Sequence, residues 1–243
     1  MTATVTLEAG ELVLGEIPFQ QVSATAILTN GLLKITPCSA SCGGGPVSAA
    51  LIATARQDDT TATALQLNAS EVDLGRLSDM VDVDVRLRGK ARFATQLSGV
   101  FRTPSQAVAA QNGTWSLNFG TGSFTPLEPR TQKPESTYHI LGASASGTLK
   151  NAIITCDDLR IQGKDFNARG RGIINLHSNT LDYTINASIP GVPNIPIRYS
   201  GSLSDPTRRI NAFKVLTSVF ANVGRHAFSL MKDIISVPFS IIK

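Results

Sequence analysis

Apolar and polar residues alternate with a period of two along most of the chain, up to about Leu203. The run Val81–Leu87 is the clearest case, because its apolar residues fall on one side and Asp82, Asp84 and Arg86 on the other. Period-two alternation is typical of strands that bury one face. The same pattern recurs at 91–97, 115–119 and 181–189, and more weakly at 22–28, 33–36, 47–53 and 65–69. It predicts a mainly β protein of roughly a dozen strands.

Turn residues separate many of these runs, as at Asn30-Gly31 and at 178–180. Such short connections favour hairpins between neighbouring strands. Residues 70–80 have room for one or two helical turns, and the Pro-containing stretch 126–136 is a point at which the β region would subdivide.

The one long helical pattern follows Asp205-Pro206, where Asp suits an N-cap and Pro a first turn. Apolar residues then recur at helical spacing, at Ile210, Phe213, Leu216, Val219 and Phe220. We therefore expect a β-groove domain over 1–206 and a C-terminal amphipathic helical segment over 207–243. That segment would either cap the end of the sheet or rest on an anionic membrane surface.

One helix cannot cover the apolar face of a dozen strands spaced about 4.8 Å apart. The sheet must close on itself as a sandwich or barrel, or bend into a trough with an unfilled inner face. Hydrophobic residues make up 42% of the chain but aromatic residues only 6%, and small side chains leave room for a guest. The fold class expected is an elongated, curved antiparallel or mixed β-sheet that forms a groove or open sandwich. Lipid acyl chains are the guest that this face fits, whereas a closed sandwich with a side-chain core remains the alternative.

The residues expected to line the groove are the apolar members of the alternating runs. They are Val81, Val83, Val85, Leu87, Phe93, Leu97, Leu117, Phe119, Leu181, Tyr183, Ile185 and Ile197.

The formal net charge is +4, and the basic excess lies after residue 207. A nucleic-acid partner is not expected, because such proteins are more basic and interleave aromatic residues for stacking. His139, His177 and His226 share no motif with a nucleophile. We expect no catalytic residues, no metal and no cofactor. Cys38 and Cys42 lie in a Gly- and Ser-rich segment, where a disulfide and two unpaired thiols are both consistent with the spacing.

Four motifs follow one another in the second half of the chain: the Asp-Asp-Leu strand within 147–161, the Gly-Arg-Gly strand within 168–176, Leu181-Asp-Tyr183, and the strand that leads to Asp205-Pro206. In this order they resemble the C-terminal region of the AsmA family of bacterial envelope proteins. Upstream, 67–77 and the Gly-containing strand 87–97 fit the same region.

AsmA proteins are related to TamB and to the bridge-like lipid transfer proteins. The resemblance implies a β-groove in the periplasm, tethered to the inner membrane through a region outside this chain. It implies a phospholipid or other lipid as cargo, envelope proteins as partners, and a role in lipid transport or outer-membrane biogenesis. It implies no enzymatic activity. A structural or assembly module for outer-membrane biogenesis, with a closed β core, is the alternative function.

Overall fold

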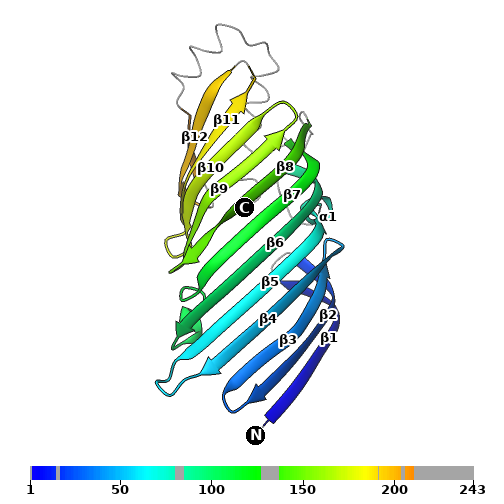
Figure 1. Cartoon of the computed structure of the whole chain (residues 1–243), viewed down its shortest axis with the longest axis vertical. Coiled ribbons are helices and arrows are strands. Elements are labelled where there is room, and N and C mark those ends of the chain that lie inside the picture. Colours follow the sequence, from blue (N-terminus) through cyan, green and yellow to red (C-terminus); the bar gives the residue numbers. More distant parts are fainter. Residues whose placement is uncertain are drawn as a thin grey trace.

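A computed structural model describes residues 2–14, 17–79, 85–126, 137–190, 192–203 and 206–210. These residues form one sheet of 13 strands, in which each strand pairs antiparallel with the next along the chain. The molecule is elongated, with β1 at one end and β12 near the other (Figure 1).

The strands are 5 to 17 residues long. The first six are β1 (Thr2–Leu14), β2 (Ile17–Thr29), β3 (Leu32–Cys42), β4 (Gly45–Ala55), β5 (Thr61–Asp73) and β6 (Val85–Phe101). The next seven are β7 (Asn112–Pro126), β8 (Tyr138–Lys150), β9 (Ile153–Gly163), β10 (Asn167–Asn175), β11 (Thr180–Ile189), β12 (Val192–Ser202) and β13 (Pro206–Ile210).

Two short helical segments lie between strands. Helix α1 (Leu74–Ser78) begins after Asp73, whose carboxylate accepts hydrogen bonds from the backbone N–H groups of Gly75 and Arg76. This is the usual N-cap arrangement, and it ends β5 by turning the chain. A 3-10 turn (Pro104–Gln106) connects β6 to β7.

The tight hairpins follow from residues that tolerate positive φ. Asn30 and Gly31 have φ of 48° and 79° between β2 and β3, and Asn151 and Ala152 have φ of 50° and 59° between β8 and β9. Positive φ at both central residues is the requirement of a two-residue hairpin turn that matches the twist of the strands.

The strand register sorts the two faces of the sheet by polarity. Directly paired residues share a face, and one such row crosses from β1 to β12 through Leu7, Ala24, Cys38, Ala49, Leu67, Thr95, Trp115, Gly147, Cys156, Gly172, Tyr183 and Tyr199. The adjacent row on the opposite face runs through Glu8, Ser23, Ser39, Ser48, Asn68, Ala94, Ser116 and Ser146. We call the first the inner face and the second the outer face.

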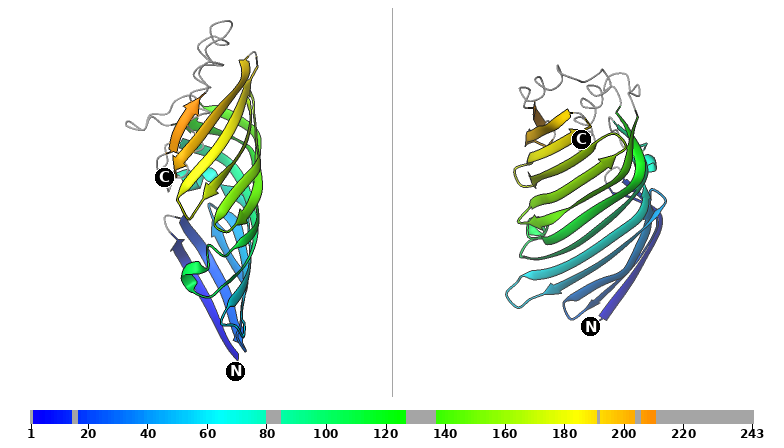
Figure 2. Two further views of the ribbon diagram at one scale, coloured as in Figure 1. Left: turned by 90° about the vertical axis from the view of Figure 1, so that its left-hand side faces the viewer. Right: turned by 45° about the horizontal axis from the view of Figure 1, so that its top comes forward.

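Bulges bend this sheet while keeping its inner face apolar. Between Ala69 and Val72 the register with β6 shifts, at a point where Glu71 has φ of 54°. The shift returns Val72 to the inner face, opposite Ala91. Bulges increase local twist and bend a strand, and the sheet is strongly twisted and curved (Figure 2).

The hydrophobic core lies on the inner face of β7–β12, with Phe166 added from the turn between β9 and β10. Its buried members are Phe124, Tyr138, Ile140, Phe166, Ala168, Leu181, Ile185, Ala187, Ile189, Ile197 and Tyr199. By contrast, the buried hydrophobic residues of β1–β5 are Val22, Cys42 and Val72. The core therefore closes one part of the sheet and leaves the other open.

The mainly β prediction is confirmed, and the described strands are antiparallel rather than mixed. The predicted start of the C-terminal helix is wrong, because residues 206–210, Ile210 included, form β13 and pair with β12. Proline is tolerated as the first residue of such a strand, so the Asp-Pro pair does not require a helix. Phe213, Leu216, Val219 and Phe220 lie outside the described residues, as does the rest of 211–243. The stretch 127–136 also lies outside them, and β7 and β8 on either side of it are paired neighbours.

Candidate functional site

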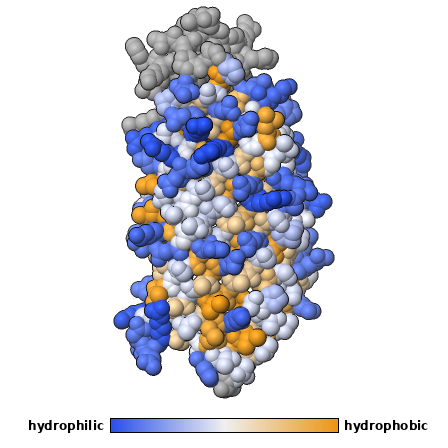
Figure 3. Space-filling view, in the orientation of Figure 1, coloured by the Kyte–Doolittle hydropathy of each residue, from blue (hydrophilic) through white to orange (hydrophobic). Residues whose placement is uncertain are grey.

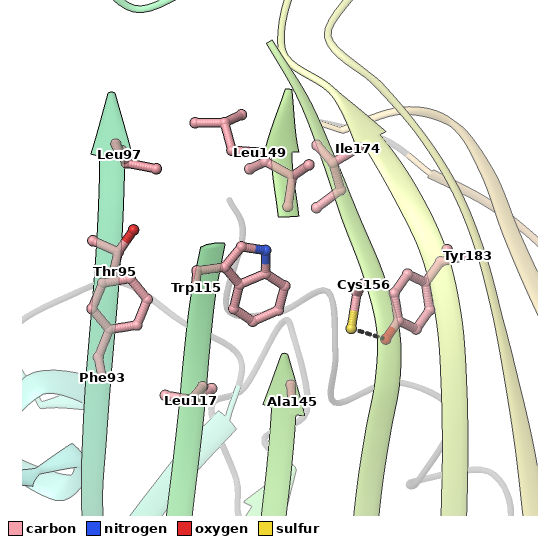
Figure 4. A pocket seen from close by; sticks show the side chains of 12 residues that line it. Phe93, Thr95, Leu97, Trp115, Leu117, Ala145, Leu149, Cys156, Ile174 and Tyr183 are labelled. Carbon is pink, nitrogen blue, oxygen red and sulfur yellow. Dashed lines mark hydrogen bonds between the residues drawn. The ribbon is translucent and has the colours of Figure 1, made fainter. Parts of the chain in front are cut away.

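The inner face contains an apolar hollow of about 420 Å³ in the middle of the sheet. Strands β6 to β11 contribute its lining, and their side chains converge on one space (Figure 4). The lining residues are Phe93, Thr95, Leu97, Trp115, Leu117, Ala145, Leu149, Ile154, Cys156, Gly172, Ile174 and Tyr183. None of these residues carries a charge. The volume is within the range of about 300–1,000 Å³ that small-molecule sites occupy.

The hollow exists because small residues stand between large ones on the same face. Along the central row, Trp115 is followed by Gly147, and Gly172 precedes Tyr183. A Cβ at Gly147 would collide with the carbonyl oxygen of Thr155, and one at Gly172 would come within 2.5 Å of the Tyr183 ring. Ala145 adds little volume to the same floor. The strands therefore sit close, and side chains of the protein do not fill the space above them.

Two polar groups in the lining bond within the protein. The hydroxyl of Thr95 donates to the backbone carbonyl of Thr114 at 2.9 Å, and the hydroxyl of Tyr183 donates to the sulfur of Cys156 at 3.2 Å. Burial, and then the bond to Cys156, raise the pKa of Tyr183 above its usual value. The phenol therefore stays neutral, and the hollow presents hydrocarbon and uncharged groups to a guest.

Four of the residues expected to line a groove meet in this hollow: Phe93, Leu97, Leu117 and Tyr183. Leu181, Ile185 and Ile197 are on the inner face too, but they are buried in the core cluster. In this structure they contact other side chains of the core cluster and do not line the hollow. Leu87 and Phe119 are half-buried and pack against that cluster. Val85 begins β6, and Val81 and Val83 lie outside the described residues.

Sequence reasoning missed eight of the lining residues. They are Thr95, Trp115, Ala145, Leu149, Ile154, Cys156, Gly172 and Ile174. Alternation places Trp115 and Thr95 in phase with Leu117 and Phe93, so the signal was present for these two. The small residues Ala145 and Gly172 give no such signal, since only the register shows that they lie between larger neighbours.

Toward β1 the inner face is open. Val5 is 63% exposed and Leu28 is 49% exposed, although both belong to the apolar face. Leu117 at the hollow is 39% exposed. Apolar surface therefore continues from the hollow toward the β1 end with little cover.

The outer face carries the charged groups. Glu71 accepts hydrogen bonds from Arg92 at 2.9 Å and from Lys90 at 3.3 Å, and these bonds, with Arg92 first, lower the pKa of Glu71. Asp182 pairs with Arg198 in the same way at 2.6 Å. A space-filling view shows hydrophilic side chains over much of one face of the molecule, with hydrophobic patches between them (Figure 3). Exposed pairs of this kind contribute little to stability.

All three cysteines are free thiols. Cys38 and Cys42 lie in regular ladder positions of β3, opposite Ala49 and Gly45. Four strand residues span about 13 Å, whereas a disulfide requires Cα atoms within about 7 Å. The disulfide is therefore wrong for this structure, and the alternative of two separate thiols holds. Burial raises the pKa of Cys42.

Within the part of the chain that the structure describes, no three His, Cys, Asp or Glu side chains are grouped so as to hold a metal ion. Among the same residues, no helix has the length and hydropathy needed to cross a bilayer.

Comparison of the sequence with protein-family models gives no match, and comparison with curated proteins gives none either. The arrangement of the inner face is therefore the basis for assigning a function.

Proposed function

We propose that this chain is a non-enzymatic lipid-binding or lipid-transfer module, whose inner face shields acyl chains from water. The observation that carries the proposal is the uncharged hollow of about 420 Å³ on an inner face that stays apolar across the sheet. Hydrocarbon offers no hydrogen bonds, so apolar contact and exclusion of water are all that an acyl chain requires of its site.

The energetics favour an occupant. Burial of apolar surface is favourable by about 25 cal/mol per Å², and patches beyond a few hundred Å² are uncommon on soluble monomers. Exposed residues such as Val5, Leu28 and Leu117 belong to one continuous face. A lipid that covers this face supplies the contacts that the protein lacks.

The resemblance to the AsmA family supplies the cellular setting of the proposal. In that setting the module is periplasmic, joined to the inner membrane through another region, and carries phospholipid toward the outer membrane with envelope proteins as partners. The polar outer face fits an aqueous compartment, because it remains hydrated while the inner face holds the cargo. The segment 211–243 keeps its two predicted roles, as a cap or a membrane-surface contact.

Photo-crosslinking tests the proposal. Leu117 faces the hollow, whereas Asn118, the next residue of β7, points to the outer face and is exposed. A photoreactive phenylalanine analogue at Leu117 is expected to crosslink co-purifying lipid, and the same analogue at Asn118 is the matched control. Equal lipid crosslinking at both positions, or none at Leu117, would overturn the proposal.

A second candidate is a structural or assembly module, and the free edge of β1 favours it. Nearly all of β1 is exposed over its 13 residues, and extended edges recruit other strands. On this view, an analogue at Thr6 in β1 crosslinks an envelope protein, while Leu117 crosslinks no lipid.

A further inference from the structure

The hollow contains one polar group without a partner. The indole Nε1 of Trp115 is buried and has no hydrogen-bond partner among the described residues. Tryptophan is a donor only, and a buried N–H left without an acceptor destabilises the folded state. Buried tryptophans normally avoid this cost by bonding to a nearby oxygen.

The polar groups beside Trp115 do not accept a hydrogen bond from its indole N–H. Thr95 lies directly opposite Trp115, but its hydroxyl bonds to the carbonyl of Thr114. On the other side stands Gly147, which has no side chain. Tyr183 and Cys156 bond to each other. In Figure 4 the nitrogen edge of the indole ring is turned toward Leu149, which is apolar.

We infer that Trp115 recognises an uncharged acceptor oxygen of the guest, so that the hollow prefers neutral acyl esters over alkanes and over free fatty acids. This inference rests on the proposed function. An ester carbonyl supplies the acceptor that the indole lacks, and it reaches Nε1 when the guest displaces the side chain of Leu149, which lines the same hollow. A carboxylate would also accept the bond, but no cation lines the hollow, and burying an unpaired charge is far more costly than one hydrogen bond repays.

Binding of three ligands that share a similar chain separates these contributions. Methyl palmitate, heptadecane and palmitate are delivered from cyclodextrin at pH 8, and their affinities are measured by equilibrium dialysis with radiolabelled ligand. The wild type is expected to bind the ester about tenfold more tightly than the alkane, the effect of one hydrogen bond in a buried site. Palmitate is expected to bind more weakly than the ester.

The substitution Trp115→Phe keeps an aromatic ring and removes the donor. It is expected to bring the affinities for ester and alkane to the same value, and the ratio of the two affinities, rather than either one, is the readout. Leu117→Ala is the matched control, because it removes apolar contact from the same hollow and should weaken both ligands equally. In the wild type, emission from Trp115, the single tryptophan of the chain, should differ between the ester and alkane complexes.

The outcomes distinguish this inference from the function on which it rests. If wild type and Trp115→Phe show the same preference for the ester, the indole is a packing group and the inference is overturned. Palmitate binding as tight as that of the ester would overturn the requirement for a neutral acceptor. If the wild type binds none of the three ligands, the proposed function itself fails.

Discussion

The inner faces of β1–β5 and β8–β12 follow the same alternation but differ in what covers them. In the first region Val5 is 63% exposed, whereas in the second Ile197 is 0% exposed. Side-chain size accounts for the difference. Residues 2–73 contain one aromatic residue, Phe19, while Tyr138, Phe166 and Tyr199 all belong to the core cluster of the second region. Alternation therefore identifies the apolar face of a strand. The size of the side chains on that face decides whether the protein buries it with its own residues.

The largest expected effect compares the closed region, β8–β12, with the open region, β1–β5. Ile197→Ala should lower the free energy of unfolding by about 3 kcal/mol, because it leaves a cavity in a packed cluster. Leu28→Ala on the open face should cost less than about 1 kcal/mol. Urea denaturation followed by circular dichroism measures both. Equal losses would mean that the two regions are covered to the same extent.

A charge placed between the two regions tests whether the hollow is a binding surface. Leu117→Lys should weaken lipid binding by at least about tenfold, since a hydrocarbon guest that covers this position would strip water from the ammonium group. Asn118→Lys, on the outer face of the same strand, should leave binding unchanged. Retention of a fluorescent phospholipid in a sedimentation assay gives both affinities. An equal loss in the two variants would point to a general effect of charge.

The β2–β3 and β8–β9 hairpins allow two turns with positive φ to be compared. Gly31 in the open region has φ of 79°, so Gly31→Ala should destabilise the protein by about 1 kcal/mol. In the closed region Ala152 already occupies φ of 59°. Ala152→Gly relieves that strain but adds unfolded-state entropy and removes a buried methyl group, so the net change should stay within about 0.5 kcal/mol of zero. Thermal unfolding midpoints will show whether the two turns differ in this direction.

The smallest effect concerns the outer face of the closed region. The hydrogen bond from Arg198, more than its charge, lowers the pKa of Asp182. A lowered carboxyl pKa stabilises the folded protein fully above the unfolded value, near about pH 4, and this stabilisation is lost as the pH falls through the lower folded value. Asp182→Asn should thus be slightly less stable than wild type at pH 7, and the difference should shrink as the pH falls below about 4. A difference that stays constant as the pH falls would contradict a role for the carboxylate charge.

The sequence predicts the faces of strands better than it predicts their ends. Phe93, Leu97 and Leu117 lie on the inner face, as period two requires. The bulge at Glu71 shifts the inward–outward alternation of β5 by one residue before Val72. The local sequence pattern does not predict this bulge. Pro206 begins a strand because β12 offers a pairing edge, and that long-range interaction outweighs the local Asp-Pro signal.

The candidate site is harder to predict than the sheet. A hollow depends on which small residues stand beside which large ones, as Gly172 stands beside Tyr183. Such neighbours come from different strands, so the register must be known first. The unpartnered indole of Trp115 is likewise a property of the assembled face and not of its own strand.

Native mass spectrometry of the purified chain tests the central claim most directly. The account predicts a protein mass accompanied by a lipid-sized increment, which is lost in Leu117→Lys and kept in Asn118→Lys. A bare protein mass for the wild type in repeated preparations, with no increment after incubation with phospholipid vesicles, would contradict it.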